Sequence, residues 1–385
     1  MAHNMIVSLL FVSLTLGAQT QVDAGSPGVD PAVSADGRWL AFASEGGASG
    51  SLHIWLRPMA GGAPRQITKG AHDDYEPAFS PDGRMLAYRS EAGGGGIYAM
   101  PIAGGKPRLL AAGGHRPRYS PDGNRVAYWA ANGLFVLDVK KNEPHRLHAG
   151  FRWAKDLVWS PDGKQILFSG CKDASEESCD WWVSAADGGE PVATHAITAF
   201  RQLHMESLPV PGCWQSSGNT ILFTSRIGEN SRVWSVSLNA ATWRIQGAPK
   251  RLTTSENDER TPVAGADGIV FYASRSSNVD VYTFPLQANA AVAKGPLTRL
   301  TNDPALDQRP SLSRDGKRIA WETSRGGNFE VWVKDLVSGM EKGLTSGPLR
   351  EHMPALSPDG ASLVYDAHDG EKVTDRKSTR LNSSH

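Results

Sequence analysis

Ser80-Pro81-Asp82-Gly83 stands between two short alternating segments, and this tetrapeptide decides the fold because it returns along the chain. Intact copies also end at Gly123, Gly163 and Gly360, and altered copies end at Gly37, Gly218, Gly268 and Gly316. Proline fixes φ near −65° and glycine accepts positive φ, so each copy predicts a tight turn between two strands. Successive glycines lie 40 to 55 residues apart, a spacing typical of one four-stranded blade per repeat.

The segments around the turns carry the alternation expected of strands. Residues 85–90 and 125–129 alternate aromatic or aliphatic with other side chains after the turn, and a third and a fourth segment follow in most repeats. A four-stranded sheet of this length cannot bury both faces alone, so neighbouring sheets must stack. The sequence therefore predicts an all-β fold, a β-propeller of four-stranded blades with seven complete repeats and a truncated eighth. An open β-sandwich with similar turn spacing is the alternative.

At residue level the repeat resembles a known family. Residues 77–88, with Gly104-Gly105 and Arg108-Leu109 downstream, are similar to the bacterial TolB-like β-propeller repeat, and the resemblance covers about residues 30–370. It implies a propeller fold, and it leaves function open among protein docking, periplasmic tasks and the non-catalytic propellers of prolyl-oligopeptidase-type serine peptidases. The chain departs from TolB itself because no α/β domain precedes the repeats and because eight repeat starts replace six blades.

Three segments are predicted along the chain. Residues 1–18 have the layout of an export signal, an apolar run from Met5 to Leu16 followed by small residues, although no Lys or Arg precedes the run. Residues 30–374 form the propeller, and periplasmic or secreted localisation follows from the signal. Residues 375–385 lack the repeat pattern and match a translated sequencing adapter, so we interpret them as an artefact that interrupts the eighth repeat; a natural polar tail is the alternative. An interrupted last blade would expose a strand edge.

Composition excludes several classes of partner and cofactor. The chain has 40 basic and 40 acidic residues and no basic run, so it lacks the charge pattern of nucleic-acid or anionic-membrane binding. The predicted hairpin that holds Cys171 and Cys179 brings its arms together, so these residues are candidates for a disulfide or remain free thiols. Cys213 is expected to be a packed thiol. No cysteine has zinc-type spacing, and neither a metal nor a cofactor is predicted.

Candidate binding residues lie in the segments that precede each first strand. In a propeller these segments open on one mouth of the central channel, where a polar ligand or peptide can enter. The candidates are Asp74, Glu76, Arg116, Asp156, Glu206, Glu259, Arg260, Asp307, Arg309, Glu351 and His352. The structural alternative is that these charges pair between neighbouring blades and fix their spacing.

The functional prediction is an exported propeller without catalytic activity of its own. The chain has no Gly-x-Ser-x-Gly turn, Walker loop or dinucleotide fingerprint. We therefore expect a rigid scaffold that docks a protein or peptide partner through one channel mouth, with no nucleic acid bound and no membrane span. The alternatives are the N-terminal propeller of a truncated prolyl-oligopeptidase-type peptidase and, from His72, His204 and His352, a propeller lyase.

Overall fold

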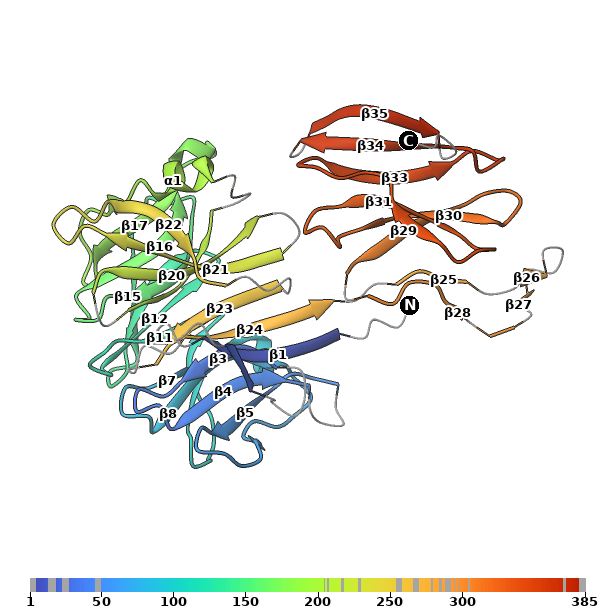
Figure 1. The fold of residues 1–385 in the computed structure, drawn as a ribbon. Coiled ribbons are helices and arrows are strands. Elements are labelled where there is room, and N and C mark those ends of the chain that lie inside the picture. Colours follow the sequence, from blue (N-terminus) through green and yellow to red (C-terminus); the bar gives the residue numbers. More distant parts are fainter. Residues whose placement is uncertain are drawn as a thin grey trace. The chain divides into compact units, whose positions relative to one another are not determined.

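The computed structural model shows a chain made almost wholly of β-strands (Figure 1). It describes residues 5–12, 19–22, 28–45, 50–203, 205, 208–215, 218–227, 230–253, 258–265, 270–277, 280–283, 286–287, 292–293, 295–296, 298–303, 305–369 and 372–380. Two compact units are present, Ile6–Arg275 and Ser276–His385 with Met1–Met5, and each is considered by itself. α1 (Ala196–Gln202) is the one α-helix in the described part of the chain. Among the described helices, none has the length and apolar character that crossing a membrane requires.

The first unit holds six four-stranded sheets. From the innermost strand outward, five of them are β3 (Gly28–Val33), β4 (Trp39–Ser44), β5 (His53–Pro58) and β6 (Arg65–Gln66); β7 (Asp74–Phe79), β8 (Met85–Ser90), β9 (Gly96–Pro101) and β10 (Arg108–Ala112); β11 (His115–Tyr119), β12 (Arg125–Ala130), β13 (Gly133–Asp138) and β14 (Glu143–Leu147); β15 (Trp153–Trp159), β16 (Gln165–Cys171), β17 (Cys179–Ala185) and β18 (Val192–Ala193); β19 (Val210–Trp214), β20 (Thr220–Ile227), β21 (Asn230–Leu238) and β22 (Ile245–Arg251). The sixth is β23 (Asp258–Ala264), β24 (Val270–Ser277), β1 (Met5–Val12) and β2 (Gln19–Val22).

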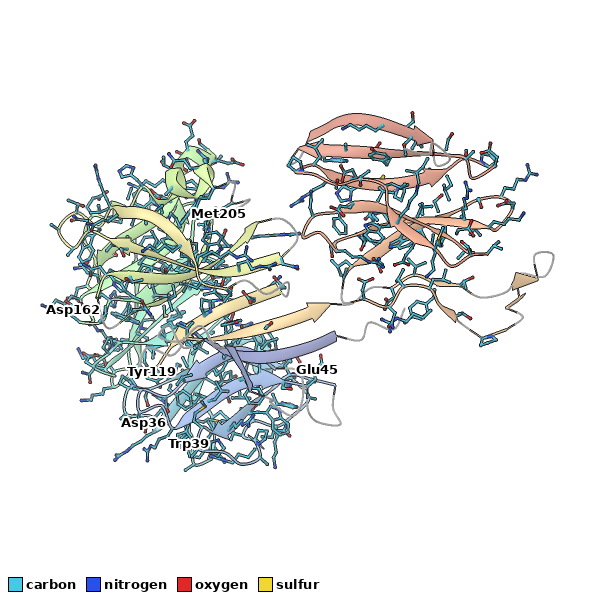
Figure 2. The ribbon with its side chains drawn as sticks, in the orientation of Figure 1. Asp36, Trp39, Glu45, Tyr119, Asp162 and Met205 are labelled. Carbon is cyan, nitrogen blue, oxygen red and sulfur yellow. A yellow bond between two sulfur atoms is a disulfide. The ribbon has the colours of Figure 1, made fainter. Side chains whose placement is uncertain are left out.

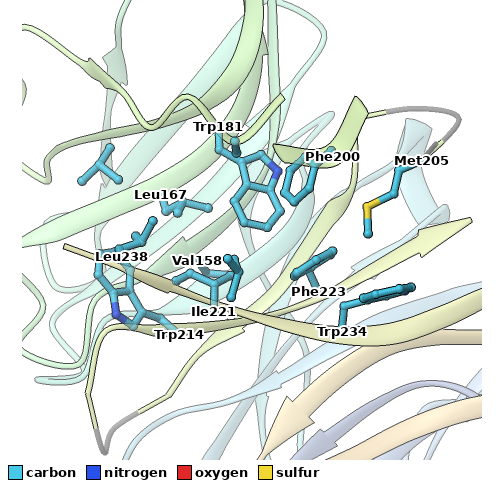
Figure 3. Packing of buried hydrophobic residues seen from close by; sticks show 13 residues of the cluster. Val158, Leu167, Trp181, Phe200, Met205, Trp214, Ile221, Phe223, Trp234 and Leu238 are labelled. Atoms are coloured by element: carbon cyan, nitrogen blue, oxygen red, sulfur yellow. The ribbon is translucent and has the colours of Figure 1, made fainter. Parts of the chain in front are cut away.

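These six sheets close into a ring. The innermost strands contact one another in the order β3, β7, β11, β15, β19 and β23, and β23 returns to β3. Apolar side chains fill the space between each neighbouring pair; Leu40 and Phe42 of the first sheet pack near Ala273 of the sixth. Between the fourth and fifth sheets, Trp181, Phe200 and Phe223 form an aromatic group with ring centroids 4.8 to 5.2 Å apart (Figure 3). The predicted β-propeller of four-stranded blades is therefore confirmed.

The Ser-x-Asp-Gly corners join the first and second strands as the sequence predicts. At the second blade, Ser80 Oγ donates to Asp82 Oδ1 at 2.5 Å and accepts from Met85 N at 2.9 Å. Gly83 has φ +67°, which explains why glycine ends the motif. Asp36 and Asp162, two of the corner aspartates, are labelled in Figure 2. The same bonds from serine to aspartate recur at the corners of Ser34, Ser120, Ser160, Ser313 and Ser357.

The count of eight blades in one ring is not confirmed, because β23 meets β3 after six sheets. The outer half of the sixth sheet is supplied by β1 and β2 rather than by the next part of the repeat. That part forms a separate pair of strands, β25 (Tyr282–Thr283) and β28 (Thr298–Arg299). β1 lies in the stretch predicted as an export signal. An edge strand exposes unpaired backbone N–H and C=O groups, and an extended segment of this length can pair with them whatever its other role.

The second unit contains the remaining repeats. Its sheets are β25 with β28; β26 (Leu286–Gln287) with β27 (Val292–Ala293); β29 (Asp307–Leu312), β30 (Arg318–Thr323), β31 (Glu330–Asp335) and β32 (Glu341–Gly343); and β33 (Arg350–Leu356), β34 (Ser362–Asp369) and β35 (Lys372–Arg380). β33 contacts β29, β30 and β31, and the two sheets share a buried cluster that includes Val331 and Val333 of β31 and Leu363 of β34. β35 includes part of the predicted artefact. Strand pairing at an open edge uses backbone hydrogen bonds, so it depends little on which side chains the added strand carries.

The structure joins Cys171 and Cys179 in a disulfide across directly opposed positions of β16 and β17. Cys213 in β19 is a free thiol, and burial raises its pKa to about 12. A thiol with so high a pKa stays protonated and unreactive at neutral pH.

We expect the corner aspartates to make stability depend on acid pH. The Ser160 hydroxyl, then the Lys164 amide, holds the pKa of Asp162 below its usual value of 3.8. A lowered native pKa contributes stability that is present above pH 3.8 and is lost as pH falls through the native pKa. Thermal melts of wild type and Asp162→Asn should therefore differ at pH 7, and the difference should shrink as the pH falls below 3.8.

The background Ser160→Ala provides the control for this titration, because it removes the principal hydrogen bond to Asp162. In that background, Asp162→Asn should leave a smaller pH-dependent difference. A difference between wild type and Asp162→Asn that is the same at pH 2.5 and pH 7 would contradict the assignment.

Candidate functional site

The inner strands of the ring share a local distortion that aims one side chain at the axis. Four residues before the first residue of the corner, for example at Glu76 before Ser80, the chain adopts positive φ and the register between the first and second strands shifts. Those residues in the first unit are Asp30, Glu76, Arg116, Asp156 and Thr261, with φ between 48° and 55°. Such bulges commonly redirect a side chain next to a functional site. In this ring they turn polar groups from five blades toward one channel.

Three successive blades are linked by ion pairs in the channel. Arg116 N donates to Glu76 Oε2 at 2.8 Å, its Nε lies 3.6 Å from Glu76 Oε1, and its Nη1 lies 3.2 Å from Asp156 Oδ1. Asp156 is buried, and the other two side chains are largely so. The structural alternative foreseen for these charges therefore holds here, because Arg116 ties β7 to β15.

Burial governs the ionisation of this network. It raises the pKa of Asp30, against the opposing charges of Arg116 and Arg118, and it raises the pKa of Glu76 against the amide and charge of Arg116. Burial also lowers the pKa of Arg118, and the charge of Arg116 lowers it further. When burial disfavours the charged form of a group, its pKa also changes strongly if another charged group enters beside it.

A cavity of about 410 Å³ opens beside this network. Its lining residues come from the first, third, fifth and sixth blades, so the cavity lies at the axis that these blades share. They are Val29, Asp30, Arg116, Leu208, Pro209, Val210, Thr224, Ser225, Arg226, Ser231, Asp258, Arg260, Thr261 and Ala273. The volume is in the range of sites that hold small ligands or short peptide segments.

Four of the predicted binding residues lie elsewhere, and this corrects the sequence interpretation. Two residues before the bulged position, the side chain is buried between blades, where it meets a threonine from the end of the preceding blade. The acidic residues are Asp74, Glu259, Asp307 and Glu351, and their threonine partners are Thr68, Thr253, Thr301 and Thr345. Each threonine hydroxyl also accepts a backbone N–H, which comes from the third strand of its own blade for Thr68, Thr253 and Thr345 and from Val281, just before β25, for Thr301. We call this arrangement the threonine clasp.

The clasp is structural because its carboxylates are inaccessible. Asp74 is 5% exposed and Glu259 is fully buried. Burial raises the pKa of Asp74, which hydrogen bonds from Ser90 and Thr68 oppose. A buried carboxyl without such partners would be strongly destabilising, so the threonine and the acid support each other.

Arg309 and His352 lie in the second unit, where both face Glu322. Arg309 Nη1 lies 3.4 Å and His352 Nδ1 lies 3.3 Å from Glu322 Oε2, and Met353 N donates to the same oxygen at 3.0 Å. Burial disfavours the charge of Glu322, but the bonds from His352 and Met353 outweigh burial and its pKa is lowered. Arg309 therefore supplies the opposite charge, and His352 and the Met353 amide supply hydrogen-bonding contacts, to a buried carboxylate between two sheets of their unit.

The predicted site thus separates into parts. Glu76, Arg116 and Asp156 meet in the channel, and Arg260 lines the cavity. Glu206 lies outside the described residues. Sequence reasoning missed Asp30, Arg118 and Thr261, although Asp30 stands four residues before its corner serine, as Glu76 does. Within the described residues no group of three or more His, Cys, Asp or Glu side chains is placed to hold a metal ion.

The fold and the channel define a β-propeller with a polar axial cavity, and the comparisons with known proteins agree on its class. The sequence profile of the TolB beta propeller domain matches residues 9–133. The structure of a putative TolB from Agrobacterium tumefaciens is similar, with a TM-score of 0.52 and 20% identity over 71% of this chain and 99% of that one. TolB from Acinetobacter baumannii aligns with a TM-score of 0.44 and 17% identity over 86% of this chain and 68% of that one. The chain is therefore a β-propeller in which residues 9–133 match the repeat of the TolB beta propeller domain.

The chain also resembles part of a longer protein. The chain is 22% identical over 262 residues to the "Uncharacterized peptidase YuxL" of Bacillus subtilis (strain 168). This alignment covers 66% of the chain and 29% of the relative, so the chain spans less than a third of that protein.

The threonine clasp predicts a specific loss of stability. Thr253→Val removes the hydroxyl that bonds Glu259 and accepts from Val233 N, and leaves both groups buried without this partner. We expect the free energy of unfolding to fall by about 1–3 kcal/mol. Urea unfolding measures it, and Thr253→Ser, which keeps the hydroxyl, is the matched control. Equal losses in the two variants would show that packing, and not the hydroxyl, is what matters at this position.

Proposed function

We propose that the chain is a binding propeller that docks a polar protein or peptide segment at its channel mouth and has no catalytic activity of its own. The observation that carries this proposal is the 410 Å³ cavity on the ring axis, beside a fixed network of charges. Because Glu76, Arg116 and Asp156 already hold one another, an entering ligand meets positioned groups and loses little loop or side-chain freedom.

The proposal also explains the mixture of charges. The cavity lining carries the carboxylates of Asp30 and Asp258 and the guanidiniums of Arg116, Arg226 and Arg260. Both signs at one mouth suit a peptide, whose backbone and side chains present donors, acceptors and charges together. A strongly one-signed surface would instead favour nucleic acid or an anionic membrane.

Selection of peptides against the protein tests docking. Peptides selected from a random library should bind the wild type and lose at least about tenfold in affinity to Val210→Trp, which places a large ring in the cavity. Val192→Trp, at an exposed position of β18, is the matched control and should bind like the wild type. Fluorescence anisotropy measures both. Selection that yields no peptide sensitive to Val210→Trp would overturn docking at this mouth.

A second candidate function is the propeller part of a serine peptidase, favoured by the similarity to YuxL. In that case the channel would admit or orient peptide substrates for a separate hydrolase domain. We expect the complete gene to encode a Gly-x-Ser-x-Gly turn between a strand and a helix beyond residue 374, and the full protein to be labelled by a fluorophosphonate. A complete coding sequence without such a domain would exclude this candidate.

We also propose export to an oxidising compartment. The apolar run near the N-terminus and the disulfide between Cys171 and Cys179 support it, because such bonds persist mainly outside the reducing cytoplasm. Alkylation of free thiols after the fractionated cells are denatured without reductant should find only Cys213 modified, in the periplasmic or secreted fraction. Three modified cysteines in the cytoplasmic fraction would contradict export.

A further inference from the structure

The cavity at the channel mouth is asymmetric, and this asymmetry indicates what it binds. On one side Glu76, Arg116 and Asp156 satisfy one another. Most of the cavity wall comes from the other side, from β19 to β24 of the fifth and sixth blades. A ligand must therefore find its partners mainly on that second side.

Three hydroxyls on that side, those of Thr224, Ser225 and Thr261, have no hydrogen-bond partner among the described residues. Thr224 is 9% exposed, and neither its Oγ1 nor the buried Oγ1 of Thr261 has a hydrogen-bond partner among the described residues. Thr224 lies on the same face of β20 as Leu222, which packs against Tyr272 of the sixth blade, so its side chain points across the cavity toward that blade. Buried polar atoms are nearly always paired, and an unpaired one at a cavity wall indicates a partner supplied from outside the chain.

A guanidinium stands at the rim of the same wall. The Arg260 side chain is 65% exposed, and its Nε donates to Asp258 Oδ2 at 2.7 Å. Asp258 is itself fixed, because its Oδ1 accepts from Ser231 N at 2.9 Å. No described residue bonds the terminal nitrogens of Arg260, which leaves the pair of donors that matches a carboxylate.

The apolar part of the lining is aliphatic. Val29, Leu208, Val210 and Ala273 form it, and no aromatic ring is among the described lining residues. Sugar-binding sites commonly offer an aromatic ring to stack on, whereas a branched aliphatic side chain needs only a wall of this kind. The lining therefore favours an aliphatic amino acid over a uronic acid as the source of the carboxylate.

From these contacts we propose that the site captures the C-terminal end of a peptide whose last residue is aliphatic. The terminal carboxylate pairs with Arg260, the adjoining backbone amides bond Thr224 and Thr261, and the last side chain packs on Val210 and Ala273. This inference rests on the proposed docking function and specifies its ligand. Arg226, also exposed at this rim, adds positive charge on the side where the carboxylate lies.

Paired peptide libraries test the inference. Fluorescein-labelled tetrapeptides that end in Val, Leu or Ile are prepared with a free carboxylate and, in parallel, as C-terminal amides. We expect the free acids to bind at least about tenfold more tightly than the amides by fluorescence anisotropy. Arg260→Gln should abolish that preference and leave the weak binding of the amides unchanged.

Arg38→Gln is the matched control. Arg38 is 76% exposed, and its Nε pairs with the aspartate two residues before it at 2.6 Å, as Arg260 does, but it lies at the corner between β3 and β4. It should keep the full preference for free acids. Loss of the preference in both variants would show a general effect of surface charge and overturn the inference.

The remaining outcomes separate the inference from the function on which it rests. Acids and amides that bind equally, both sensitive to Val210→Trp, would overturn carboxylate capture and leave docking standing. Oligogalacturonate that displaces the free-acid peptides and binds more tightly than they do would assign the site to a uronide. Binding of no peptide in either form would overturn both proposals.

Discussion

Each blade of this chain is apolar on both faces, and neither face is stable in water. Leu86 and Ala87 are adjacent in β8, point to opposite sides and are both fully buried, in clusters shared with different neighbouring sheets. Burial of such residues is the dominant favourable contribution to folding, and here it can be completed only when every sheet has a neighbour on each side. A ring satisfies this requirement because every sheet then has two neighbours, and the contact of β23 with β3 completes it in the first unit. The channel on the axis is therefore a geometric consequence of packing before it is a functional feature.

The inner strands resolve a conflict that closure creates. Burial near the crowded axis favours the pairing of polar side chains, and most of the ring achieves it in two ways. The bulge turns one residue per blade inward, where Glu76, Arg116 and Asp156 pair across three blades. Two residues earlier, the threonine clasp holds an acidic side chain between blades. Acidic residues that look alike in the sequence therefore serve different roles, and backbone conformation determines which role each one has.

This division explains how far the sequence could be interpreted. The corner serine, aspartate and glycine act through bonds within one turn, so Ser80-Pro81-Asp82-Gly83 predicts its own geometry and, by repetition, the propeller. The positive φ of Glu76 depends on the neighbouring strand, and the threonine of a clasp is several residues from its acid, so local pattern did not separate Glu76 from Asp74. Blade number is harder still, because the partner of the β24 edge is decided by competition between distant segments. β1 occupies that edge, while Val281 and Thr301 of the second unit repeat the backbone contact made by Val233 and Thr253.

The pairing of charges also distinguishes two sides of the channel, the ion-paired side and the side that lines the cavity. Arg116 pairs with both Glu76 and Asp156, so the charges on this side are satisfied within the chain. We therefore expect this side to contribute fixed geometry more than affinity for a ligand. Where Pro211 occupies the fifth blade and Thr261 the sixth, the ring lacks opposed charges, and the cavity opens at that gap. Substitution of two ionic positions by an imino acid and a hydroxyl leaves space and unpaired hydrogen-bonding groups together. A propeller can thus form a cavity where its charge network is interrupted in adjacent blades, while the remaining blades hold the opening in shape.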